Sequence, residues 1–168
     1  MKTHDFLLEL GTEELPPKLL LKLSSSLKDN LSQELNKLNI SSKTIKAFAT
    51  PRRLAVSISE LQSKQKNQII EKKGPSTQSP EMAVNGFAKS CGVNVDKLEI
   101  KELGGKEYFF YTKEEPGQNI RDLLPAIIEK SIKNIPITRA MKWGDLDYSF
   151  VRPVHWLVVM LDQDIVKT

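Results

Sequence analysis

The sequence contains little cysteine or histidine. Its 168 residues include one cysteine, Cys91, and two histidines, His4 and His155. A single thiol excludes an internal disulfide, and so few sulfur and imidazole ligands exclude a zinc site of the cysteine or cysteine–histidine type. The sequence therefore predicts no structural metal centre, and its low cysteine content fits a reducing compartment.

Long apolar runs are also absent. No stretch of about 18 apolar residues occurs, and the chain does not open with a basic segment followed by a continuous apolar one. Hydrophobic residues make up 39% of the chain and charged residues 27%, a composition typical of globular domains. We therefore expect neither a membrane span nor a secretory signal, no membrane partner, and a cytoplasmic location.

Positive charge is concentrated in the middle of the chain. Residues 43–73 hold eight lysines and arginines against two glutamates, a net charge of +6, whereas the whole chain carries only +4. Because clustered cations attract polyanions, this segment is the first candidate for contact with phosphate groups. Lysines on solvated strand faces would give the same pattern, so both interpretations stay open.

Hydrophobic periodicity predicts the secondary structure. Leucines spaced three and four residues apart between Leu20 and Leu38 predict a long helix that begins near Pro16 and Pro17. Shorter helices are predicted at 82–91 and 120–134, and an ordered loop at 135–148. Strands are predicted at 6–10, 44–49, 54–61, 68–72, 98–103, 108–113 and 154–161. We expect an α+β fold with a mixed, mainly antiparallel sheet packed by one long N-terminal helix and shorter helices.

No catalytic site is evident in the sequence. Glu13 and Glu14 follow a strand and precede a helix, but adjacent residues seldom converge on one substrate atom. These carboxylates are interpreted as favouring the positive end of the helix that follows. Cys91 is interpreted as a packed thiol and His155 as a structural imidazole with its hydrogen bonds satisfied, so no catalytic residue is predicted.

Arginine and tryptophan occur together in two places. One is the junction at Arg52 and Arg53, and the other is the late segment between residues 139 and 156. Guanidinium groups beside flat apolar rings suit the phosphates and unstacked bases of RNA. They equally suit a protein interface, or an internal role in which arginines bridge loop carbonyls and tryptophan packs in the core.

Six short motifs follow one another along the chain. They are FLLELGTEELPPK at 6–18, ATPRRLA at 49–55, KGP at 73–75, GFA at 86–88, MKWG at 141–144 and FVRPVHW at 150–156. Each motif is weak alone, but their common order is specific, and together they resemble the β subunit of the two-subunit bacterial glycyl-tRNA synthetase.

This resemblance implies a function as part of a glycine–tRNA ligase. In that family glycine activation, which uses ATP and Mg, is assigned to the separate α subunit, while the β subunit supports tRNA recognition and aminoacylation. The implied partners are the α subunit, tRNA-Gly and the rest of the β subunit, with no cofactor held by this segment, which alone is expected to be inactive. A structural docking module without RNA contact is the alternative. The predicted tRNA- or partner-binding residues are Arg52, Arg53, Lys72, Lys73, Lys142, Trp143 and Arg152.

The domain organisation follows from the same comparison. The family's subunit is several times longer, so residues 1–168 are expected to be an N-terminal fragment of such a subunit. The order of predicted elements suggests a subdivision into a strand-helix-strand-strand unit at 1–75 and a helix-hairpin-helix-strand unit at 76–168.

Overall fold

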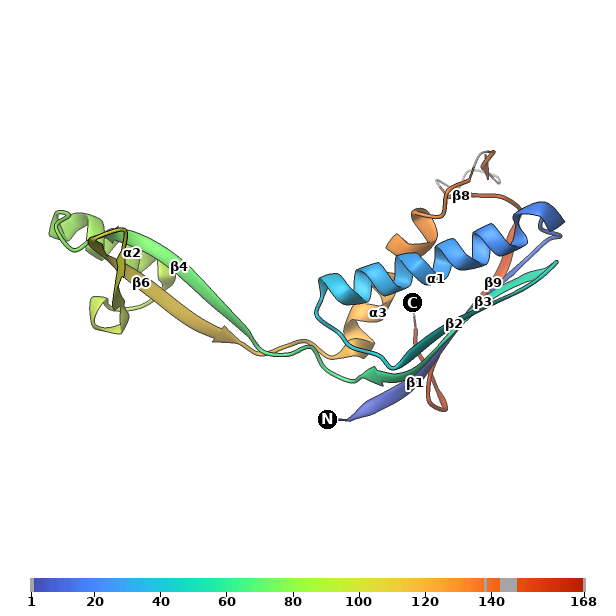
Figure 1. Ribbon diagram of the computed structural model, residues 1–168, viewed down its shortest axis with the longest axis horizontal. Coiled ribbons are helices and arrows are strands. Elements are labelled where there is room, and N and C mark those ends of the chain that lie inside the picture. The colour runs from blue at the N-terminus through green and yellow to red at the C-terminus, as the bar shows by residue number, and fades with distance from the viewer. Residues whose placement is uncertain (1, 138, 143–147, 168) are drawn as a thin grey trace. The chain divides into compact units, whose positions relative to one another are not determined.

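The chain folds into two compact units. The computed structural model describes residues 2–137, 139–142 and 148–167. Unit 1 comprises Met1–Lys66 and Gln118–Thr168, and unit 2 comprises Asn67–Gly117 (Figure 1). The boundary predicted at residue 75 falls inside a strand of unit 2. The division differs from that prediction because residues 68–76 pair with residues 106–115 further along the chain.

Unit 1 is built on a five-stranded antiparallel sheet. Strand order is β10-β9-β1-β3-β2. Helix α1 (Leu20–Lys37) joins β1 to β2 after a short 3-10 turn, and helix α3 (Ile120–Lys133) precedes β9. The strands are β1 (Thr3–Thr12), β2 (Thr44–Thr50), β3 (Arg53–Gln62), β9 (Val154–Leu161) and β10 (Asp164–Ile165). The sequence of elements β1-α1-β2-β3-α3-β9, with β1 and β3 central, is the ferredoxin-like split βαβ topology.

The core of unit 1 lies between the sheet and its two helices. Both α1 and α3 cover the same face of the sheet (Figure 1). On β1, Phe6, Leu8 and Leu10 alternate with less buried residues, because successive strand side chains point to opposite faces. The leucine stripe predicted for α1 is confirmed, since every fourth residue from Leu23 to Leu35 is buried against this core.

Helix α3 is fixed at its start and along its length. The Asn119 side chain accepts a hydrogen bond from Arg121 N at 3.0 Å, which caps the helix as expected for asparagine. The Asn30 side chain on α1 donates to the Ser131 carbonyl at 2.9 Å and links the two helices. Pro125 is accommodated inside the helix. The segment predicted as a loop at 135–148 contains the short strand β7 (Met141–Lys142), which pairs with β8 (Ser149–Phe150) just beyond it.

Unit 2 consists of a three-stranded antiparallel sheet and helix α2 (Glu81–Cys91). Its strands are β4 (Gln68–Ser76), β5 (Glu99–Leu103) and β6 (Lys106–Glu115), in the order β4-β6-β5. The predicted hairpin between β5 and β6 is confirmed, and its turn places Gly104 and Gly105 at φ of 62° and 77°, where glycine is favoured. Helix α2 packs on β4, where a side chain at Gly74 would collide with the Phe87 ring.

The α+β prediction with one long and two shorter α-helices is confirmed. A single mixed sheet is wrong for the described residues, whose strands form three separate sheets with antiparallel pairs throughout. The inserted unit is the physical reason, because β4, β5 and β6 pair only with one another. Over the described residues, no helix has the length and apolarity required to cross a membrane.

Candidate functional site

One end of the unit 1 sheet gathers charged and aromatic side chains. It is formed where β1 ends, where β2 turns into β3 and where β9 begins. Backbone hydrogen bonds hold these segments together: Thr12 N donates to Arg52 O at 3.0 Å, and Glu13 N donates to Pro153 O at 3.0 Å. We call this group the sheet-end cluster, and its members are Glu9, Glu13, Glu14, Arg52, Arg53, Arg152, His155 and Trp156.

The three arginines of the cluster contact acidic or carbonyl oxygens. Arg52 Nη2 lies 3.4 Å from Glu14 Oε1, and Arg53 Nη1 lies 3.2 Å from Glu9 Oε1. Arg152 Nε donates to the Glu14 carbonyl at 3.1 Å. Because the Arg52 and Glu14 side chains are about two-thirds exposed, this pair contributes little to stability. A phosphate group can therefore compete for Arg52 without a large loss of folding free energy.

Trp156 lies directly over Gly11. A Cβ atom at Gly11 would be 2.0 Å from Cε2 of the Trp156 ring, so only glycine leaves room for this arrangement. The Arg53 guanidinium lies 5.3 Å from the ring centroid, a cation–π contact. Trp156 is 39% exposed. The cluster thus presents a partly exposed ring beside an arginine, as base-stacking sites and protein hot spots both do.

His155 and Glu13 form a pair that sequence reasoning missed. His155 Nε2 lies 3.0 Å from Glu13 Oε1, and the two residues are 142 positions apart. Both side chains are about half exposed, so the imidazole belongs to the surface of the cluster and is not a packed core residue. Alternation along β9 gave no signal for this pair, because it places His155 on the same face as the buried Val159 and Leu161.

The structure brings together only part of the predicted site. Arg52, Arg53 and Arg152 are in the sheet-end cluster, and Lys142 is in β7, where it pairs with Ser149. The sulfur atom of Met141, the residue before Lys142, lies 4.0 Å from Nη1 of Arg152. Predicted site residue Trp143 lies outside the described residues.

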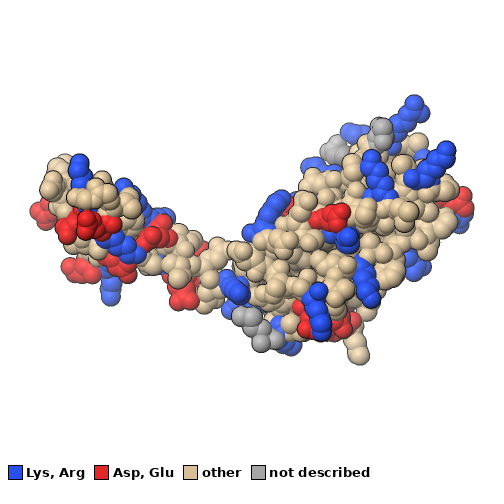
Figure 2. Space-filling view, in the orientation of Figure 1, with Lys and Arg blue, Asp and Glu red and all other residues tan. Residues whose placement is uncertain are grey.

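Lys72 and Lys73 belong to the other unit. They are adjacent on β4 and therefore point to opposite faces of the unit 2 sheet, with Lys73 Nζ 3.7 Å from the centroid of the Tyr108 ring. The basic segment 43–73 is thus divided between two folded units. Unit 1 contains 18 basic and 13 acidic residues, or +5, whereas unit 2 contains 7 and 8, or −1. Figure 2 shows the same contrast, with mainly basic side chains on the visible face of unit 1 and mixed signs on unit 2.

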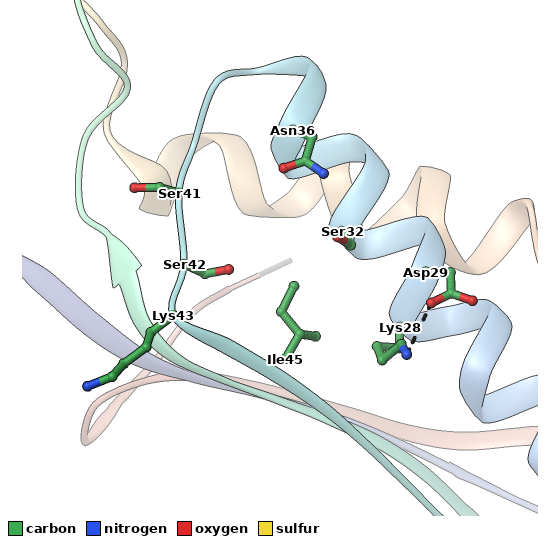
Figure 3. Close-up of a pocket in the computed structure, with 8 residues that line it drawn as sticks. All are labelled: Lys28, Asp29, Ser32, Asn36, Ser41, Ser42, Lys43 and Ile45. Carbon is green, nitrogen blue, oxygen red and sulfur yellow. Dashed lines mark ion pairs between the residues drawn. The ribbon is translucent and has the colours of Figure 1, made fainter.

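A polar hollow of about 490 Å³ lies between α1 and the start of β2 (Figure 3). Lys28 Nζ is 3.3 Å from Asp29 Oδ1, and Lys43 is paired with Glu60, so both lysines already have acidic partners. Among the described residues, no buried side-chain nitrogen or oxygen lacks a hydrogen-bond partner. The hollow is lined by Lys28, Asp29, Ser32, Asn36, Ser41, Ser42, Lys43 and Ile45.

Three charged groups outside the sheet-end cluster have shifted pKa values. Hydrogen bonding and charge attraction from Glu60 raise the pKa of Lys43, and hydrogen bonds to Glu71 and Glu99 raise the pKa of Lys101. A hydrogen bond with His4, and then one from the backbone of Asp5, lower the pKa of Asp162. No group of three His, Cys, Asp or Glu that could hold a metal ion occurs in the part of the chain described.

Comparison with known proteins gives a consistent match over the whole chain. The family model described as "Glycyl-tRNA synthetase beta subunit" matches residues 6–168. The glycine–tRNA ligase beta subunit of Coxiella burnetii (strain RSA 493) is 46% identical over 173 residues, which cover 99% of this chain and 25% of the relative. The subunit of Hahella chejuensis is 39% identical over 99% of this chain and 25% of its own length. The subunit of Edwardsiella ictaluri is 38% identical over 98% of this chain and 25% of its own length. The chain therefore spans about a quarter of the length of the curated relatives it matches.

Proposed function

Because the chain belongs to the glycyl-tRNA synthetase beta subunit family and corresponds to its N-terminal part, we propose that it functions within a glycine–tRNA ligase. In this proposal it supports tRNA recognition and aminoacylation, while glycine activation with ATP takes place on the α subunit. The sheet-end cluster is the part of unit 1 that contacts the phosphate backbone of tRNA-Gly. The partners of the chain in this proposal are the α subunit, tRNA-Gly and the rest of the β subunit.

The sheet-end cluster carries this proposal. Arg52 and Arg53 are exposed, lie on a unit with net positive charge, and stand beside the partly exposed ring of Trp156. Arginine forks suit phosphate oxygens, and aromatic rings accept unstacked bases. The carboxylates of Glu9 and Glu14 hold the two guanidinium groups in place until a backbone phosphate, whose two free oxygens can accept both N–H groups of the guanidinium fork, replaces them.

The alternative is a docking module for the α subunit or other β domains that makes no contact with RNA. The paired state of the cluster favours it, because each arginine already has an oxygen partner within unit 1. The two proposals differ in their dependence on salt. Contacts to tRNA phosphates release counterions, so affinity falls steeply with salt, whereas an apolar interface responds weakly.

The experiment uses the complete two-subunit ligase with Arg52→Glu and Arg53→Glu combined. We expect tRNA-Gly binding to weaken by about tenfold or more and the slope of log affinity against log salt to fall by about 0.9 for each lost phosphate contact. Glycine-dependent exchange of pyrophosphate into ATP, which reports activation alone, should stay unchanged.

A matched control reverses two exposed lysines just beyond the C-terminal end of β3. Lys64→Glu and Lys66→Glu change the net charge of unit 1 by the same amount, at the opposite end of this strand from Arg53. If both pairs of substitutions weaken tRNA binding equally, the effect is due to the overall charge of unit 1 and not to the cluster. Unchanged tRNA binding by the arginine pair in a folded, assembled ligase would reject the proposal, and loss of α–β assembly would support the docking alternative.

A further inference from the structure

The face of the unit 1 sheet opposite α1 and α3 carries several large apolar side chains, with polar residues among them. Figure 1 shows both helices of unit 1 on the other face. Strand register places Leu7 beside Met160, Glu9 beside Val158 and Gly11 beside Trp156. On the other side of β1, Ala55 lies between Glu9 and Phe48. We call this surface the open sheet face, and its large apolar members are Leu7, Phe48, Trp156, Val158, Met160 and Ile165.

Strand β9 gives the clearest sign that this face is covered in the complete protein. Val159 and Leu161 are buried toward the helices, while Trp156, Val158 and Met160 alternate with them and face the other side. An antiparallel strand with one solvated face normally alternates apolar and polar residues, whereas an apolar run on both faces is typical of strands buried on both. Phe48 is 53% exposed and Ile165 72%. Contiguous apolar patches of this kind mark interaction surfaces.

The chemistry of the face favours a protein occupant over RNA. Away from Arg53 and Trp156, which the face shares with the sheet-end cluster, its basic residue among those described is Lys46, and Glu9 places a carboxylate between Val158 and Ala55. An RNA platform needs several cations along a backbone path and open rings for stacking. Here the aliphatic side chains of Leu7, Val158 and Met160 lie together, with the carboxylate of Glu9 beside them. An apolar protein surface is complementary to this pattern.

We propose that the open sheet face is a docking surface for a segment of the same β-subunit polypeptide outside residues 1–168. The matched relatives are about four times as long as this chain, so most of their subunit is further polypeptide. A tethered segment binds the face intramolecularly, at an effective concentration that reaches about millimolar for a short flexible linker. The inference rests on family membership and on the apolar residues of the face away from Arg53 and Trp156, which the face shares with the sheet-end cluster.

The test places a photocrosslinking amino acid, p-benzoylphenylalanine, at Met160 in the full-length β subunit assembled with its α subunit. Isotopically heavy and light β subunits are mixed before assembly, so that mass spectrometry separates crosslinks within one chain from those between two copies. We expect crosslinks from Met160 to residues after 168 of the same chain, at about tenfold the yield of the control position. The control is Leu21, which is 84% exposed on α1.

A second probe at Phe48, on strand β2, keeps the test informative if the Met160 variant does not fold. The same crosslinks are expected from Phe48. Crosslinks mainly to the α subunit, to tRNA, to a second β copy or to residues 67–117 would overturn the proposal, as would a yield no higher than that of Leu21. Because Arg53 lies on this face, Arg52→Glu alone separates the two proposals: it should weaken tRNA binding and leave these crosslinks unchanged.

Discussion

Replacing Gly11 with alanine places a methyl group where the Trp156 ring now lies. The new Cβ atom would be 2.0 Å from Cε2 and 2.4 Å from Nε1 of the ring, whereas non-bonded carbon atoms are separated by about 3.5 Å or more. The ring must therefore move outward by about 1.5 Å. Since Trp156 is already 39% exposed, it can swing toward solvent, but it then loses its packing on Gly11 and its contact with Arg53.

The expected cost follows from these two losses. Overpacking typically destabilises a protein by about 1–3 kcal/mol, and an exposed cation–π contact is worth about 0.5–1 kcal/mol. Glycine to alanine in a strand otherwise stabilises by about 0.5–1 kcal/mol, because the unfolded chain loses freedom. We expect a net loss of about 1–2 kcal/mol in the free energy of unfolding of unit 1.

Tryptophan fluorescence during urea unfolding measures this loss. Both tryptophans, Trp143 and Trp156, lie in the sequence of unit 1, so a Trp143→Phe background makes Trp156 a reporter of unit 1 alone. Gly11→Ala should lower the midpoint and shift the folded-state emission to longer wavelength. The matched control is Gly86→Ala on α2, where the new methyl group meets no atom within 4 Å and should leave this signal unchanged.

A double variant decides whether the collision is the cause. With Trp156→Ala in the same chain, the added methyl group has room, so Gly11→Ala should cost at least about 1 kcal/mol less than it does alone. Circular dichroism replaces fluorescence for this variant. Purely additive losses, together with unchanged emission from the single variant, would refute the argument that Gly11 is required by the Trp156 ring.

Two further predictions concern the core and the response to acid. Leu27 is fully buried on α1, so Leu27→Ala should lower the free energy of unfolding of unit 1 by about 2–5 kcal/mol, and a loss below about 1 kcal/mol in urea would contradict the described core. Asp162 has a pKa below its ordinary value of 3.8, so its carboxylate stabilises the fold above that pH and the contribution disappears as pH falls through the lower pKa of the folded state. Asp162→Asn should therefore reduce the loss of stability between about pH 5 and pH 2, and an unchanged pH profile would exclude this role.

Local features of the fold follow from the sequence because they depend on neighbouring residues. The spacing of leucines set the buried face of α1, and the paired glycines at 104 and 105 set the tight turn between β5 and β6. The division into units depends instead on pairing between residues 68–76 and 106–115, which no local pattern encodes. An inserted unit therefore escaped a prediction that assigned consecutive elements to consecutive domains.

The candidate site shows the same limit. Arg52 and Arg53 were identified because arginines at a strand junction are conspicuous in the sequence, and Arg152 because it lies near tryptophans. Lys72 is separated from Arg53 by only 19 positions, yet it belongs to another folded unit. In contrast, His155 and Glu13 are far apart in sequence and 3.0 Å apart in space. Charge density along the chain is thus a poor guide to charge density on the surface.

The geometry of the insertion explains how unit 1 keeps its topology. Gln65 N donates to the Gln118 carbonyl at 2.9 Å, and Ile120 N donates to the Ser63 carbonyl at 2.9 Å, so the chain leaves and re-enters unit 1 at adjacent points. Closing a long inserted segment across such a short gap adds little entropy cost.

The points where the chain leaves and re-enters unit 1 lie beyond the end of β3 at Gln62, whereas the sheet-end cluster lies at the other end of β3, at Arg53. Ten strand residues separate the ends by about 30 Å, far more than the screening length of about 8 Å in physiological salt. The ion pairs of the cluster are formed entirely within unit 1, and so they do not require the inserted unit.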